Sequence, residues 1–141
     1  MLTHISQKEP GLVGKRFGAI AVAAVAAIVA WLLMENLFDV EMIAPSMQGR
    51  PTMDIGPLPI AGSVIVATLI GWGVYAFMER RTQNPRRAWT TFAVVGALLS
   101  LGAPFSGEGL DTSQRVQLAA LHVVVAAVFI PLFERTAKSQ P

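Results

Sequence analysis

Four long apolar stretches constrain this chain more than any other feature. They cover residues 17–37, 60–78, 85–103 and 116–133, which are 21, 19, 19 and 18 residues long. A helix rises about 1.5 Å per residue, so each stretch would span roughly 27–32 Å, close to the hydrocarbon thickness of a bilayer. We therefore predict an all-α integral membrane four-helix bundle, with antiparallel helices in up-down-up-down order.

The overall composition agrees with this prediction. The 141 residues are 53% hydrophobic and 14% charged, whereas a soluble domain has roughly 25% charged residues. We expect one transmembrane domain over residues 1–141. The first stretch lacks a small-residue cleavage site and a polar stripe, which disfavours a secretory signal and a buried soluble helix. The chain has no cysteine, which excludes disulfides and thiolate metal sites.

The basic residues predict the orientation in the membrane. Nine of the eleven fall on one side of the four predicted spans: Lys8, Lys15, Arg16, Arg80, Arg81, Arg86, Arg87, Arg135 and Lys138. Cytoplasmic segments carry the excess of Lys and Arg. We therefore expect a multi-pass protein of the bacterial inner (plasma) membrane, with cytoplasmic tails at residues 1–15 and 135–141.

The connection between the first two spans is the longest. It covers residues 38–59 and contains several prolines and glycines, so a continuous helix is unfavourable there. It is also too apolar for a freely solvated loop. We expect this external loop to fold back over the mouth of the bundle, with one short helical turn near residues 39–44.

Small residues are frequent in the first span, which contains Ala19, Ala23, Ala26, Ala27 and Ala30. Small residues allow close approach between membrane helices. They favour packing inside the bundle, and a homo-oligomer that associates through this span is the alternative.

Ionisable groups inside a membrane are costly and are functional candidates by default. Two such groups occur in the predicted spans, Glu35 near the external end of the first and His122 in the fourth. Together with Arg115 they are candidates for one polar cluster under the external loop. A histidine beside a carboxylate titrates near neutral pH, so the cluster would respond to protons or a ligand. The alternative is that Glu35 is hydrated at the interface and His122 has a structural role.

No catalytic motif is present, and we expect a protein that is not an enzyme. We expect no metal or other cofactor, because the methionines around the first loop follow no ligand spacing. The basic residues form no nucleic-acid patch. Arg80, Arg81, Arg86 and Arg87 are explained by topology and are also candidates for binding anionic lipid headgroups.

Two segments carry a family resemblance. MERRTQNPRRAWTTFAVVGALLSLGAPFSG, at 78–107, and LAALHVVVAAVFIPLFERTA, at 118–137, resemble a family of small bacterial four-helix membrane proteins, mostly actinobacterial, classed as a domain of unknown function. The resemblance implies four spans and draws attention to His122, and it implies no activity.

Two functions follow from the sequence. The favoured one is an accessory or structural membrane protein that acts through contacts with lipid or with a membrane protein partner. The alternative is a small oligomeric transporter or channel that uses Glu35 and His122 as a responsive site. The accessory role is favoured because both residues lie on one side of the membrane midplane, whereas transporters need polar groups near the middle.

Overall fold

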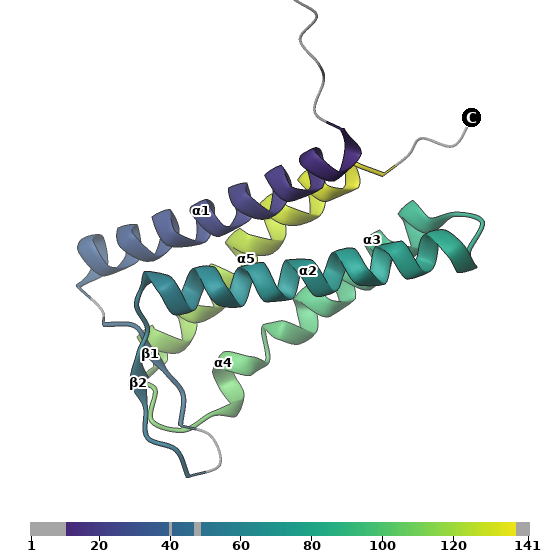
Figure 1. The fold of residues 1–141 in the computed structure, drawn as a ribbon. Coiled ribbons are helices and arrows are strands. Elements are labelled where there is room, and N and C mark those ends of the chain that lie inside the picture. The colour runs from purple at the N-terminus through teal and green to yellow at the C-terminus, as the bar shows by residue number, and fades with distance from the viewer. Residues whose placement is uncertain (1–10, 40, 47–48, 138–141) are drawn as a thin grey trace, which may run out of the picture.

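The computed structural model describes residues 11–39, 41–46 and 49–137, which form five helices and two short strands (Figure 1). In chain order the elements are α1 (Leu12–Phe38), β1 (Ile43–Ala44), β2 (Met53–Asp54), α2 (Pro57–Arg81), α3 (Pro85–Ser100), α4 (Ala103–Ser106) and α5 (Thr112–Glu134). Four segments are long and apolar enough to cross a membrane: α1, α2, α3 together with α4, and α5. The prediction of an all-α protein with four candidate spans is confirmed. Most of the two predicted tails lies outside the described residues.

The four long helices form a bundle in which α1 and α3 each pack against both α2 and α5. Two ion pairs connect opposite ends of neighbouring helices. Arg16 near the start of α1 meets Glu79 near the end of α2, and Arg86 near the start of α3 meets Glu134 at the end of α5. Neighbouring helices in the ring therefore run in opposite directions (Figure 1). We call the end that contains these two pairs the arginine end.

Helix α1 contributes mainly small side chains to the core of the bundle. Ala19, Ala23, Ala27 and Ala30 are all buried, and their spacing places them on one face of the helix. Large side chains such as Val25 instead point outward and are more than half exposed. Small residues inside and bulky residues outside are typical of helices that pack closely within lipid. These four alanines thus serve packing inside the bundle.

The third predicted span, 85–103, is divided in the structure. Helix α3 ends at Ser100, and the four-residue helix α4 follows after Leu101 and Gly102. The reason is Pro104, which has no N–H to donate to the Ser100 carbonyl and whose ring would clash with that carbonyl in a continuous helix.

The connection between α1 and α2 forms a small antiparallel hairpin. Ile43 pairs with Asp54, and Ala44 pairs with Met53. The short helical turn expected near residues 39–44 is therefore wrong for the described residues 41–44. Ala44 precedes Pro45, and a residue before proline is pushed away from the helical region into extended backbone.

This hairpin is fastened to the connection that precedes α5. Ser46 and Glu108 exchange two backbone hydrogen bonds of 2.9 and 3.3 Å, and Gln114 donates from its side chain to the Glu41 carbonyl. Met42, only 1% exposed, belongs to the core, and the partly buried Ile43 and Ile55 pack against it. We call this end of the bundle, opposite the arginine end, the hairpin end.

Candidate functional site

An elongated groove of about 590 Å³ runs between α2, α3 and α5. It exists because α3 packs loosely. Trp89 is the one buried residue of α3, whereas α1 contributes seven buried residues to the bundle. A volume of this size lies within the range of roughly 300–1,000 Å³ that is usual for small-molecule sites.

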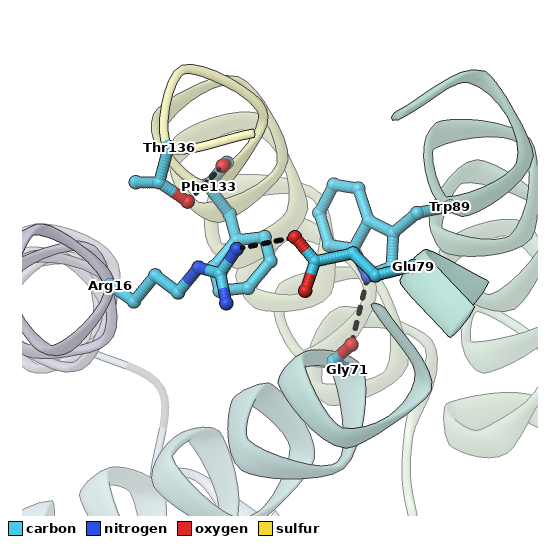
Figure 2. A network of polar contacts seen from close by, with 6 residues as sticks. All are labelled: Arg16, Gly71, Glu79, Trp89, Phe133 and Thr136. Atoms are coloured by element: carbon cyan, nitrogen blue, oxygen red, sulfur yellow. Dashed lines mark hydrogen bonds and ion pairs between the residues drawn. The ribbon is translucent and has the colours of Figure 1, made fainter. Parts of the chain in front are cut away.

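The arginine end of the groove is closed by aromatic side chains. The indole Nε1 of Trp89 donates a 2.9 Å hydrogen bond to the Gly71 carbonyl, as Figure 2 shows. The rings of Trp89 and Phe129 lie 6.1 Å apart, edge to face. A Cβ at position 71 would lie 3.5 Å from the Phe129 ring, an ordinary van der Waals distance, so the Phe129 ring of α5 reaches close to the α2 backbone at Gly71. We call Trp89, Gly71 and Phe129 the aromatic floor.

Among the described residues, the polar side chains that line the groove above this floor are Ser63, Thr68, Ser100 and His122. Each of them bonds to a carbonyl of its own helix. Ser63 donates to Pro59, Thr68 to Val64 and Ser100 to Ala97. His122 Nδ1 lies 2.7 Å from the Leu118 carbonyl oxygen. Thr68 is 3% exposed and is bonded within its helix, so Ser63, Ser100 and His122 are the polar lining residues that a ligand could reach.

The structure does not bring the three residues of the predicted polar cluster together. Arg115 donates hydrogen bonds of 2.8 Å to the carbonyls of Pro104 and Gly107, so it fastens α4 and the following turn to α5. His122 lines the groove, and Glu35 is half-buried near the end of α1. Within the described ranges, no hydrogen bond or ion pair joins Glu35, His122 and Arg115 to one another.

The four arginines between α2 and α3 have different surroundings. Arg86 pairs with Glu134 at 3.1 Å, and the Arg81 guanidinium lies 5.4 Å from the centroid of the Phe77 ring. The Arg87 backbone N–H is capped by Asn84. All four residues, Arg80 included, are exposed, so their charges remain accessible at the arginine end.

Sequence reasoning missed the most deeply buried charge. Arg16, predicted only as a topology determinant, is 5% exposed and lies 3.2 Å from the Glu79 carboxylate (Figure 2). Its guanidinium also lies 4.8 Å from the centroid of the Tyr75 ring and 5.7 Å from that of Phe133. The available signal was the presence of Glu79 and Glu134 among so many basic residues, because isolated acids there imply ion pairs.

These features define the class of the protein. Four apolar helices of membrane-spanning length, joined by short connections and a small hairpin, make it an all-α membrane protein. The chain belongs to DUF6069, a family of unknown function whose model matches residues 7–139. This match confirms the resemblance to a domain of unknown function. No curated protein and no solved structure matches the chain.

Proposed function

We propose that this protein is a non-catalytic membrane protein that holds a lipid-class molecule in the groove between α2, α3 and α5. The observation that carries the proposal is the groove itself, an apolar space of about 590 Å³ within a bundle of only four long helices. An open space of this size among apolar side chains forfeits packing energy unless something fills it. In a bilayer, the available filler is lipid or another apolar molecule.

Charge supports binding rather than transport. Among the described residues, no Asp, Glu, Lys or Arg lines the groove. A path for ions needs polar groups near the membrane midplane, and Glu35, which the transporter alternative requires, is absent from the groove lining. The accessory role therefore has more structural support than the transporter.

For the location, we propose the bacterial inner membrane with both termini in the cytoplasm. The support comes from the arginine end, where the Arg16–Glu79 and Arg86–Glu134 pairs join the start of α1 to the end of α2 and the start of α3 to the end of α5. The Lys and Arg excess of the sequence is thereby gathered at one end of the bundle, as the positive-inside rule requires for a cytoplasmic face. Exposed Arg80 and Arg87 at this end are available to anionic headgroups.

The proposal is tested by filling the groove. Gly96 lines it, and a Cβ added at this position meets no neighbouring atom within 4 Å. We therefore expect Gly96→Phe to be accommodated and to place its ring in the groove. Gly73 is a matched control, because it is equally open but lies on the exposed face of α2, outside the lining.

The measurement is native mass spectrometry of protein released from membranes in mild detergent. We expect the unchanged protein and Gly73→Phe to retain a bound lipid-class molecule, and Gly96→Phe to lose it. Equal lipid retention by all three proteins would contradict the proposal. A stoichiometric protein partner that is lost only in Gly96→Phe would replace lipid with a partner helix as the occupant.

A further inference from the structure

We propose that the groove selects a neutral amphiphile, a long apolar chain with one hydrogen-bond donor such as a hydroxyl, and that this donor binds His122 Nε2. The apolar chain then runs toward the aromatic floor. The inference rests on the proposed lipid-binding function and adds to it the chemical class of the ligand and its direction in the groove.

The hydrogen bonding of His122 selects a donor. A backbone carbonyl oxygen only accepts hydrogen bonds. The Nδ1 atom that lies 2.7 Å from the Leu118 carbonyl must therefore carry the proton of this contact. In a neutral imidazole the other nitrogen, Nε2, is then an acceptor. No bond from Nε2 to another residue is present in the described part of the chain, so a ligand hydroxyl that donates to it would meet an unused acceptor.

The polar lining is concentrated toward the hairpin end. Ser63 precedes Gly71 by eight residues, and His122 precedes Phe129 by seven, which places them about 12 Å and about 10 Å above the aromatic floor. Ser100, the last residue of α3, follows Trp89 by eleven residues and is about 16 Å above it. Thr68, three residues before Gly71, is the exception, but it is buried and its hydroxyl is bonded to carbonyls of its own helix. The polar groups that a ligand can reach therefore lie toward the hairpin end, which orients a molecule that has a polar head and an apolar tail.

The absence of charge in the lining restricts the head. Among the described lining residues there is no carboxylate, ammonium or guanidinium group. A phosphate or carboxylate head held at His122 would leave an uncompensated charge in an apolar site, which costs far more than a hydrogen bond returns. A neutral alcohol has no such cost.

The walls of the groove suit a flexible chain. Small residues line it on each of the three helices: Ala67 on α2, Ala93, Gly96 and Ala97 on α3, and Ala126 on α5. The lining follows all three helices from the hairpin end down to Trp89. An extended hydrocarbon chain fits this shape better than a broad ring system.

The test uses Trp89 as a reporter of the tail. In a Trp31→Phe/Trp72→Phe background, Trp89 is the remaining tryptophan. The probes are a long-chain primary alcohol brominated at its terminal carbon and the methyl ether of the same molecule, which cannot donate a hydrogen bond. Bromine quenches tryptophan fluorescence on contact, so quenching reports both binding and the direction of the chain.

We expect both probes to quench Trp89, and the alcohol to bind about tenfold more tightly than the ether, as one net hydrogen bond predicts. His122→Leu should bring the alcohol down to the affinity of the ether and leave the ether unchanged. His122→Gln, which restores an acceptor, should recover part of the preference. A Ser63→Ala variant controls for loss of a lining hydroxyl that is already bonded within its helix.

The outcomes separate this inference from the proposed function. Equal affinity of the alcohol and the ether, with both lost in Gly96→Phe, would overturn the selection of a donor and leave lipid binding intact. If neither probe quenches Trp89 in the Trp31→Phe/Trp72→Phe protein with His122 unchanged, both proposals are overturned. A preference for the alcohol that survives in His122→Leu would overturn the role of His122.

Discussion

Arg16 Nη2 lies 3.2 Å from Glu79 Oε1 and joins α1 to α2 at the arginine end, with the ring of Phe133 on α5 beside the pair. The two partners differ in burial, because the Arg16 side chain is 7% exposed and that of Glu79 is 30% exposed. The arginine Nε has no hydrogen-bond partner in the described structure. The stacked aromatic rings therefore supply part of the stabilisation of the cation.

This asymmetry predicts unequal effects of removing either partner. Glu79→Gln leaves a buried cation without its counter-charge and should lower the free energy of unfolding by roughly 2–3 kcal/mol. Arg16→Met leaves a carboxylate that water can reach, and it should cost roughly 1 kcal/mol. The double variant should be close to Arg16→Met alone. The measurement is unfolding by SDS titration in mixed micelles, and a larger loss in Arg16→Met than in Glu79→Gln would contradict the prediction.

A second prediction compares two tryptophans. Trp89→Phe keeps an aromatic ring but removes the hydrogen bond to the Gly71 carbonyl, and it should cost about 1 kcal/mol of unfolding free energy. Trp31 has a buried Nε1 with no partner among the described residues, so Trp31→Phe removes an unsatisfied donor. That change should be neutral or stabilising. The same SDS titration measures both, and equal destabilisation by the two variants would be inconsistent with this bonding pattern.

The fastening of the hairpin depends on Gly109. Its φ is +83°, and an added side chain would begin 2.7 Å from Thr52 Cγ2. Gly109→Ala should therefore loosen the contact between the α1–α2 hairpin and the turn before α5, at a cost of more than about 1 kcal/mol. Hydrogen exchange of residues 49–56 should accelerate. Gly56→Ala is the control, because its backbone is extended and no atom lies within 4 Å. Unchanged exchange in Gly109→Ala would show that the contact does not hold the hairpin.

The start of α5 has a capping box. Asp111 accepts from the Gln114 backbone N–H at 2.8 Å, and the Gln114 side chain accepts from the Asp111 backbone N–H at 3.0 Å. Asp111→Ala should cost about 1 kcal/mol in thermal or SDS unfolding, since the cap satisfies free helix N–H groups. Exposed Ser113 makes no described hydrogen bond, so Ser113→Ala should leave the stability unchanged. Equal effects of the two changes would argue against the cap.

Because the chain contains no cysteine, single-cysteine labelling gives a clean test of orientation. Gln83→Cys, in the α2–α3 connection, should react with a membrane-impermeant maleimide only after the cells are permeabilised. Ser113→Cys, at the hairpin end, should react in intact cells. The reversed pattern would invert the topology proposed from the Lys and Arg distribution.

Much of the architecture could be predicted from residue type and spacing. Helix number and type follow because hydrocarbon requires every backbone polar group to be satisfied within the segment, and a long apolar run does this as a helix. Helix caps depend on only a few neighbouring residues. Asn84 caps α3, and Asp111 with Gln114 caps α5, as their spacing indicates.

Some local outcomes depended on competition between signals. The stretch near residues 39–44 could form a helical turn or an extended strand. Residues 43 and 44 form a strand because Ile43 pairs with Asp54 and Ala44 pairs with Met53, eleven and nine positions away. The α3–α4 break at Leu101 and Gly102 is explained by Pro104, whose effect extends to the carbonyl four residues earlier.

The sequence by itself determined that this protein has four apolar segments suited to a lipid bilayer and that its basic residues gather at alternate connections. These properties depend only on hydropathy and charge along the chain. Tertiary structure alone decided which polar groups face one another. It buried Arg16 beside Glu79 and placed His122 in the lining of a groove. It also placed Arg115 where its guanidinium donates hydrogen bonds to the carbonyls of Pro104 and Gly107. The physical reason is that the rotation and separation of packed helices are set by side-chain contacts between distant segments, and the loose packing of α3 that opens the groove has no counterpart in local sequence.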